Sequence, residues 1–352
     1  MTVSDIPEDA HLEYLVKGRG RARKPVVTIY DIAKVAGVNP STVSRALSNP
    51  GRVSAKTRKL VEEAAAELHF QANPFARALP TGRTKTFRLI VADITNPTFF
   101  EIIRGAGKSA AGRDYTLVLV DAAESGVTEL TAARRMSATV DGLILASPRM
   151  DDRDIQILAR DKPLVVVNRQ VDGVACVIPD VAKGIGQAVR ALAANGHKNL
   201  VFIAGPPLSW MSDRRWEGVR AACEWSRLEA TRLDSSRPTV DGGREVARAV
   251  RNSGATAVVA YNDLLAIGLM QELQAGGIEV PDAVSIVGFD DIFGADFTTP
   301  SLTTIRSPLG ECGSLATELV LDLLDGSREE IRTLHAETEL VLRGSSGRPL
   351  PA

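Results

Sequence analysis

The sequence of 352 residues lacks several features that mark whole classes of protein. It has no run of 18 apolar residues, and its first residues lack the apolar core of a signal peptide, so we expect neither a membrane span nor secretion. Its cysteines are too few and too widely spaced for a disulfide framework or a thiolate metal site; they are Cys176, Cys223 and Cys312. We therefore expect a cytoplasmic protein whose thiols are reduced and buried.

Sequence signatures of enzymes are missing as well. Neither triad nor metal-ligand spacing is found among the four histidines, which are His11, His69, His197 and His335. No GxGxxG follows the first apolar run, which argues against a dinucleotide fold. The segment GAGKSAAG at 105–112 contains a GKS, but a phosphate loop needs glycine where this chain has Ile102. We therefore expect no enzymatic activity, no metal and no cofactor.

The near-zero net charge of −1 conceals a strong gradient along the chain. Residues 17–88 contain 15 Lys and Arg against 4 Asp and Glu, a net charge of +11, so the remaining residues carry −12. A basic unit attached to an acidic body is typical of a DNA-binding domain joined to a sensor. Residues 1–25 are polar, end in KGRGRARK and predict a disordered basic extension; translation from a later start is the alternative.

Residues 28–47, TIYDIAKVAGVNPSTVSRAL, predict a helix-turn-helix. Thr28 and Asp31 have the spacing of a capping box, and Gly37 supplies the backbone freedom for a sharp turn. A second helix buries Val43 and turns a row of small polar residues and one arginine outward, namely Pro40, Ser41, Thr42, Ser44 and Arg45. A short helix with such a face fits the major groove of DNA.

A third helix and a short linker complete this region. Ser54 precedes AKTRKLVEEAAAEL, whose apolar residues face inward, so residues 26–72 form a three-helix headpiece. Residues 73–85 follow, with a short helical run, Phe75 to Leu79, that ends at Pro80. So short a helix is not stable alone, which predicts a hinge that orders on DNA.

From residue 86 the chain alternates apolar runs with helical segments. The runs are FRLIVAD, TLVLVD, GLILAS, PLVVVN, NLVFIAG, AVVAYN and VSIVGFD, and the helical segments are 99–111, 128–139, 184–195, 212–227, 241–253 and 262–276. This α/β pattern predicts doubly wound parallel sheets covered on both faces. So many units over about 250 residues favour two lobes over one.

Polar residues follow these runs at the ends where such folds bind ligands. They include Asp93 to Phe100, Ser147 to Arg149, Asn168 with Arg169, Asp213 to Arg215 beyond the NLVFIAG run, Asn262 with Asp263, and Asp290 with Asp291. Such donors and acceptors, with aromatic faces beside them, suit a polyol or a nucleobase. For Asn262 the alternative is an ordinary helix cap.

The segments TIYDIAKVAGVNPSTVSRALSN, VSAKTRKLVEEAAAEL and NPFARAL…GRT resemble the headpiece and hinge of the lactose/galactose-repressor (LacI/GalR) family of transcription regulators. The resemblance extends over residues 26–345. It implies a repressor that binds a palindromic double-stranded operator as a homodimer. The implied DNA contacts, with Leu79 wedged into the minor groove, are Thr28, Ser41, Thr42, Ser44, Arg45, Asn73, Arg77 and Leu79.

The resemblance also implies a core that resembles periplasmic binding proteins. Its lobe 1 would span about 86–179 and 306–335, and its lobe 2 about 180–305 and 336–345. A small-molecule effector, expected to be a sugar or related polyol, would bind between the lobes at Phe99, Phe100, Ser147, Asn168, Arg169, Trp210, Arg215, Asn262 and Asp290. The chain departs from the family at Asp180-Val181, where DN is frequent, which weakens inference of the effector's identity. The alternative function, a receptor for transported solutes, is disfavoured by the headpiece.

Overall fold

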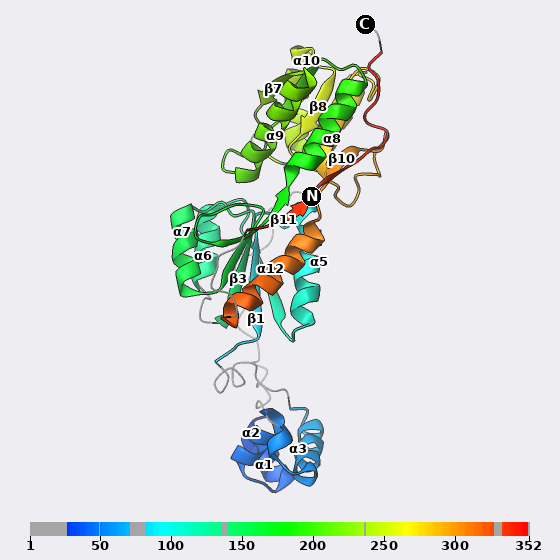
Figure 1. Cartoon of the computed structure of the whole chain (residues 1–352). Coiled ribbons are helices and arrows are strands. Elements are labelled where there is room, and N and C mark those ends of the chain that lie inside the picture. Colours follow the sequence, from blue (N-terminus) through cyan, green and yellow to red (C-terminus); the bar gives the residue numbers. More distant parts are fainter. Residues whose placement is uncertain are drawn as a thin grey trace, which may run out of the picture. The chain divides into compact units, whose positions relative to one another are not determined.

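A computed structural model describes residues 27–48, 50–70, 82–135, 139–235, 237–326 and 333–350. The chain divides into two compact units, Met1–Gly82 and Arg83–Ala352, which are called unit 1 and unit 2 below (Figure 1). The predicted extension 1–25 and the predicted hinge helix from Phe75 to Leu79 lie outside the described residues.

Unit 1 contains the three predicted helices. They are α1 (Ile29–Ala36), α2 (Pro40–Ser48) and α3 (Ala55–Glu67), with a 3-10 turn, η2 (Pro50–Arg52), between the last two. Gly37 ends α1 in the left-handed region with φ of 66°, as the predicted turn requires. The Ser54 hydroxyl accepts a hydrogen bond from the Thr57 amide at 3.2 Å and so caps α3. The helices share a small apolar core of Ile32, Ala33, Val43, Ala46, Val61 and Ala64.

Unit 2 is built on two six-stranded sheets. The sheet of lobe 1 has the order β11-β5-β4-β3-β1-β2, and every described pair in it is parallel. Its strands are β1 (Thr86–Val91), β2 (Thr116–Asp121), β3 (Gly142–Ala146), β4 (Leu164–Val167), β5 (Ala175–Asp180) and β11 (Thr333–Glu337). The sheet of lobe 2 has the order β12-β10-β9-β8-β6-β7, in which only the β10–β12 pair is antiparallel among those described. Its strands are β6 (Asn199–Ile203), β7 (Glu229–Leu233), β8 (Ala257–Ala260), β9 (Ser285–Asp290), β10 (Thr303–Arg306) and β12 (Glu339–Val341).

Helices cover the sheets on both sides, as the continuous Val, Ile and Leu runs predicted (Figure 1). In lobe 1, α5 (Thr98–Ala111) packs with α12 (Leu309–Leu324) on one face, and α6 (Gly126–Arg135) and α7 (Asp152–Asp161) cover the other. In lobe 2, α8 (Val181–Ala194) packs with α9 (Trp210–Ser226), and α10 (Val240–Ser253) packs with α11 (Asp263–Ala275). The predicted fold class is therefore confirmed.

The chain passes between the lobes at three places. These are the connections from β5 to α8, from β10 to α12 and from β11 to β12. Thr338, which lies in the third connection, is fully buried, and its hydroxyl donates to the carbonyl oxygen of Asp180 in the first connection at 2.7 Å. This bond ties two crossings together, so the lobes are joined by a compact bundle of chain rather than by one loose linker.

Candidate functional site

Three of the predicted effector residues lie where strands end and have left-handed backbone. Ser147 follows β3 with φ of 55°, Asn168 follows β4 with φ of 65°, and Asp290 ends β9 with φ of 101°. Residues other than glycine avoid this region, and each exception costs about 1–3 kcal/mol. Such residues cluster at functional sites, so these strand ends form the candidate effector site.

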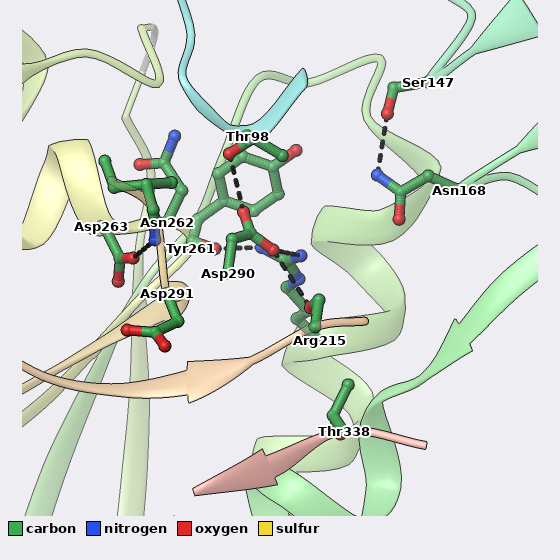
Figure 2. Close-up of polar contacts among 12 residues, drawn as sticks. Thr98, Ser147, Asn168, Arg215, Tyr261, Asn262, Asp263, Asp290, Asp291 and Thr338 are labelled. Atoms are coloured by element: carbon green, nitrogen blue, oxygen red, sulfur yellow. Dashed lines mark hydrogen bonds and ion pairs between the residues drawn. The ribbon is translucent and has the colours of Figure 1, made fainter. Parts of the chain in front are cut away.

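At the centre of this site lies a buried ion pair. Arg215, on α9 in lobe 2, has a side chain that is 2% exposed and donates from Nη2 to Oδ1 of Asp290 at 2.6 Å. Its Nη1 donates to the carbonyl oxygen of Tyr261 (Figure 2). The guanidinium also lies 3.7 Å from the centre of the Phe289 ring, which removes it further from water. Buried charges are retained where they are paired and hydrogen-bonded, as both are here.

The same carboxylate also joins the two lobes. The Thr98 hydroxyl, at the start of α5 in lobe 1, donates to Oδ2 of Asp290 at 3.1 Å (Figure 2). The Ser307 hydroxyl, in the crossing before α12, donates to Oδ1 at 3.3 Å. Asp290 therefore accepts hydrogen bonds from lobe 1, from lobe 2 and from the connection between them. Thr98 lies in the segment predicted after the first apolar run, whereas Ser307 is not among the residues predicted from the sequence.

Lobe 1 contributes a second polar cluster. The Asn168 amide donates to the Ser147 hydroxyl at 2.7 Å, while its buried Oδ1 atom has no hydrogen-bond partner (Figure 2). Arg149, which the sequence places directly after an apolar run, donates to the Ser147 carbonyl oxygen at 2.9 Å and forms two bonds with Glu124, at 2.6 and 3.2 Å. Burial lowers the pKa of the Arg149 guanidinium, but Tyr261 of lobe 2 and Glu124 outweigh it, so the pKa is raised. Glu124 therefore holds the charged Arg149 side chain beside Ser147.

Two further side chains hold the turn that carries Arg149. A carboxylate oxygen of the buried Glu129 accepts from the amides of Arg149 and Met150, at 2.8 and 3.0 Å. Burial raises the pKa of Glu129 in spite of these bonds. Arg169, a predicted effector residue, donates to the carbonyl oxygens of Pro148 and Met150, both at 2.9 Å. In this structure Arg169 therefore braces the turn.

Asn262, another predicted effector residue, makes both of its side-chain hydrogen bonds within lobe 2. Its Oδ1 accepts from the Leu265 amide at 3.0 Å and caps α11, and its Nδ2 donates to the Pro238 carbonyl oxygen at 2.9 Å. These bonds correspond to the helix-cap interpretation. Direct contact of Asn262 with an effector stays a prediction.

Asp263 follows Asn262 and is completely buried. Its carboxylate accepts from the Thr304 hydroxyl at 2.5 Å and from the Ile292 amide at 2.8 Å. Burial nevertheless raises the pKa of Asp263 to about 8, since the two hydrogen bonds only partly compensate for the loss of water. Asp263 supports the turn after β9 and thereby the Asp290 side of the site.

The predicted apolar residues occupy different environments. Phe99 lies in the core of lobe 1, whereas the neighbouring Phe100 is 45% exposed. Trp210 and Met211 begin α9 in lobe 2 but pack against the apolar cluster of lobe 1 that lies beneath α6 and α7. The start of α9 therefore rests on lobe 1, close in sequence to Arg215.

A cavity of about 630 Å3 opens beside the ion pair. Thr98, Phe100 and Asp290 line it, together with residues of the turn after β9 and of the crossing into α12. Its volume lies in the range of small-molecule sites, about 300–1,000 Å3. Of the nine predicted effector residues, Phe100 and Asp290 line this cavity, and the other seven are not among its lining residues.

The candidate DNA-binding face lies on unit 1. On α2 the predicted contact residues are exposed, except the half-buried Thr42; they are Ser41, Thr42, Ser44 and Arg45. The Arg45 Nε atom donates to the Ser41 carbonyl oxygen at 3.1 Å. Thr28 donates from its amide and its hydroxyl to Asp31, at 2.8 and 2.7 Å, as the predicted cap at the start of α1. The remaining predicted contacts lie outside the described residues; they are Asn73, Arg77 and Leu79.

The described part of the chain holds neither a metal-binding cluster nor a membrane-spanning helix. No group of three or more His, Cys, Asp or Glu side chains there could hold a metal ion. No described helix is both long and apolar enough to cross a membrane.

Comparison with known proteins places both units in one family. The model of bacterial regulatory proteins of the lacI family matches residues 28–73, and a model of periplasmic binding protein-like domains matches residues 189–346. The HTH-type transcriptional repressor CytR of Escherichia coli K12 is 31% identical over 341 residues, which cover 95% of this chain and 100% of CytR.

Solved structures agree with these matches. The Lac repressor dimer bound to operator and the anti-inducer ONPF is 25% identical, with a TM-score of 0.83, and the match covers 91% of this chain and 99% of the repressor. The transcriptional regulator CelR in complex with cellobiose is 29% identical, with a TM-score of 0.69 and the same coverage. The headpiece match leaves no support for the solute-receptor alternative. This chain belongs to the LacI family of bacterial regulatory proteins, as a DNA-binding transcription regulator and not an enzyme.

Proposed function

We propose that this regulator is a repressor whose affinity for its operator is set by a sugar or related polyol bound between the lobes of unit 2. The observation that carries the proposal is the buried Arg215–Asp290 pair, which meets Thr98 of lobe 1 at strand ends with strained backbone. A ligand at this contact touches both lobes and so favours one angle between them. The cellobiose complex of CelR supports a sugar as the ligand class.

In the proposed site, Arg215 donates to ligand hydroxyls, and Asp290 accepts from them. Ser147 and Asn168 supply a second donor and acceptor set from lobe 1. Phe100 and Trp210 provide aromatic faces for the apolar side of a sugar ring. Arg169, Asn262 and Phe99 shape the site from behind, through the turn, the helix cap and the core that they hold.

We further propose that the chain acts on DNA as a homodimer. A palindromic operator needs two headpieces, and one small headpiece covers too little DNA for tight specific binding. Ser41 and Arg45 would contact base edges, with Thr28, Thr42, Ser44, Asn73 and Arg77 positioning the headpiece and Leu79 opening the minor groove. The Lac repressor, bound to its operator as a dimer, supports this arrangement.

A thermal-shift screen of sugars, nucleosides and their phosphates, followed by calorimetry, tests the effector site. We expect Arg215→Met to weaken binding of the best ligand by about 10- to 100-fold, because a ligand hydroxyl loses its partner in a dry site. Arg232→Met is the matched control, since Arg232 is a more exposed arginine of lobe 2 that pairs with Asp213. Equal affinity in wild type and Arg215→Met would show that the site is elsewhere. Footprinting of the operator with and without the ligand tests whether the ligand changes the affinity of the protein for its operator.

A further inference from the structure

The arginines around the candidate effector site share one property: each already has a carboxylate partner. Arg215 pairs with Asp290 at 2.6 Å, and Arg149 pairs with Glu124 at 2.6 Å. The side chains of both arginines are at most 5% exposed, so these pairs lie in a largely dry environment.

The remaining charges near the site follow the same rule. Arg169 pairs with Asp152 at 2.6 Å, and Arg214, which lies over the Trp210 ring, pairs with Glu217. Three arginines also line the cavity. Arg104 pairs with Glu101, whereas Arg306 and Arg343 share Asp291, and Arg306 also pairs with Glu339. Glu129 adds one further buried carboxyl group. Among the described residues, each arginine at the site therefore has a carboxylate partner.

An anionic ligand would therefore meet an unfavourable balance at this contact. To pair with Arg215 or Arg149 it would have to displace Asp290 or Glu124, and the displaced carboxylate would remain unpaired in a largely buried position. Without displacement the anion would lie beside existing carboxylates. A neutral hydroxyl-bearing ligand meets neither problem, because hydroxyls can bond to an intact ion pair through its free lone pairs and N–H groups.

Two buried polar atoms add to this argument. Oδ1 of Asn168, an acceptor on lobe 1, and Nε of Arg215, a donor on lobe 2, have no hydrogen-bond partner among the described residues. Buried groups without partners are costly, so a ligand that satisfies them gains affinity. A hydroxyl group is both donor and acceptor and can serve either atom, whereas a phosphate dianion cannot donate to Asn168.

From this balance we propose that the effector of this regulator is uncharged, a neutral sugar or nucleoside rather than a sugar phosphate, a nucleotide or a sugar acid. The inference rests on the proposed function, since it assigns the ligand class of the same site. It identifies Glu124 as a specificity-determining residue, because Glu124 neutralises Arg149, a buried arginine that bonds to Ser147 of the candidate site.

The test uses pairs of compounds that differ only in charge, measured by calorimetry on the full chain. The pairs are ribose and ribose phosphate, glucose and glucose phosphate, cytidine and its monophosphate, and galactose and galacturonate. For every pair in which either member binds, we expect the neutral member to bind about 100-fold more tightly or better, as the cost of an unpaired buried charge implies. An anionic member that binds as well as its neutral counterpart, or better, overturns the inference.

A charge variant tests the cause. Glu124→Gln leaves Arg149 without its carboxylate, so we expect the preference for the neutral member to shrink by at least about tenfold. Glu318→Gln is the matched control, because it breaks an ion pair with Arg113 that shares no residue with the site, and its preference should stay at the wild-type value. If Glu124→Gln keeps the wild-type preference, Arg149 does not face the ligand and the charge argument fails. Should Glu124→Gln fail to fold, the wild-type pairs still decide.

The two proposals fail in different ways. Preference for anions overturns the neutral-effector inference alone, because an effector site between the lobes would still exist. If no member of any pair binds, the sugar-effector proposal and this inference both fall. Operator footprinting on the same sample then shows separately whether DNA binding is intact.

Discussion

The Asp290 carboxylate shows how one side chain can stabilise a strained backbone in unit 2. Asp290 keeps an unfavourable φ of 101° because Arg215, Thr98 and Ser307 all donate to its side chain. A side chain held by one hydrogen bond could move, and its backbone could return to a favourable φ. Asp290 cannot do so, because three donors from different parts of the fold hold its side chain in place. The strain and the hydrogen bonds are therefore two aspects of one arrangement.

Asp263 should make the stability of the protein depend on pH. The unfolded chain loses this proton near pH 4, whereas the native state keeps it until about pH 8, because burial disfavours the carboxylate. Between these values the unfolded state binds fewer protons, so the free energy of unfolding falls as the pH rises, by at most about 1.4 kcal/mol per unit. Asp263→Asn can keep both hydrogen bonds, with Thr304 as acceptor, and cannot titrate. We therefore expect its thermal midpoint, relative to wild type, to rise steadily from pH 5 to pH 7.

The control for this prediction is Asp234→Asn, which changes a well-exposed carboxylate on lobe 2. Its midpoint relative to wild type should vary much less over the same range. Parallel pH profiles for Asp263→Asn and wild type would mean that Asp263 is ionised in the native state despite its burial.

At the scale of residues, the sequence was informative where chemistry and position coincide. Arg215, Asn168 and Asp290 could be predicted because polar residues follow apolar runs, and the structure brings them to the contact between the lobes. The partners of Arg149 and Thr98 could not be predicted, since they lie far along the chain: Glu124 is 25 residues from Arg149, and Asp290 is 192 residues from Thr98. The sequence also does not show which of the adjacent Phe99 and Phe100 faces the core of lobe 1.

Helices α5 and α12 pack so closely that glycines are needed at their contact, among them Gly105 on α5 and Gly313 on α12. A Cβ atom on Gly105 would lie 1.9 Å from the carbonyl oxygen of Gly310 on α12. We expect Gly105→Ala to destabilise unit 2 by about 1–3 kcal/mol, because the two helices must separate. Gly107→Ala on the same helix is the control: its nearest contact is a Leu117 methyl at 3.9 Å, and helix propensity predicts stabilisation by up to about 1 kcal/mol. Chemical denaturation of both variants gives the test, and equal effects of one sign would refute the close-packing argument.

Helix α2 presents the surface that we expect to meet DNA. If Arg45 contacts a guanine edge, Arg45→Ala should weaken specific operator binding by about 1–3 kcal/mol per half-site. Non-specific binding should fall much less, since it depends mainly on total positive charge. Arg58→Ala, on the exposed side of α3, removes the same charge and serves as the control. Footprint titrations that give the same operator affinity for Arg45→Ala and wild type would exclude this role.

Helices and strands with a clear apolar pattern in the sequence could be predicted. Those that are recognisable only from strand pairing or helix packing could not. The seven apolar runs correspond to β1, β2, β3, β4, β6, β8 and β9. Strand β5 contains Pro179, which interrupts the pattern, and β10, β11 and β12 are short strands that only pairing defines. Helix α12 contains Gly310 and Gly313 and is apolar on several sides because it lies between α5 and the sheet. These features hide the helical period that marks an amphipathic surface helix.

At the scale of the whole molecule, effector binding in unit 2 must change DNA binding by unit 1 through the chain that joins them. The chain enters unit 2 at Arg83, and its first residues are held tightly there. The Asp141 carboxylate accepts from the Thr84 amide and hydroxyl, at 2.6 and 2.7 Å, and from the Lys85 amide at 2.9 Å. Arg83 forms an ion pair with Asp325, at the end of α12, at 2.7 Å. The covalent link to the headpiece therefore starts from a fixed point on lobe 1.

Because this fixed point transmits any movement of lobe 1, loosening it should weaken communication without changing either binding site. Linkage requires the operator to change effector affinity by the same factor as the effector changes operator affinity, and such coupling is typically about 1–3 kcal/mol. In Asp141→Asn, one hydrogen-bond acceptor becomes a donor that faces backbone amides, so the chain at Thr84 is less firmly held. We expect the affinity for each ligand alone to stay within about twofold of wild type, a change well under 1 kcal/mol, while the coupling factor falls in both directions equally. Asp161→Asn, an exposed position on lobe 1, should leave the coupling unchanged. Full coupling in Asp141→Asn, measured by operator titrations with and without the effector, would mean that the signal leaves unit 2 by another route.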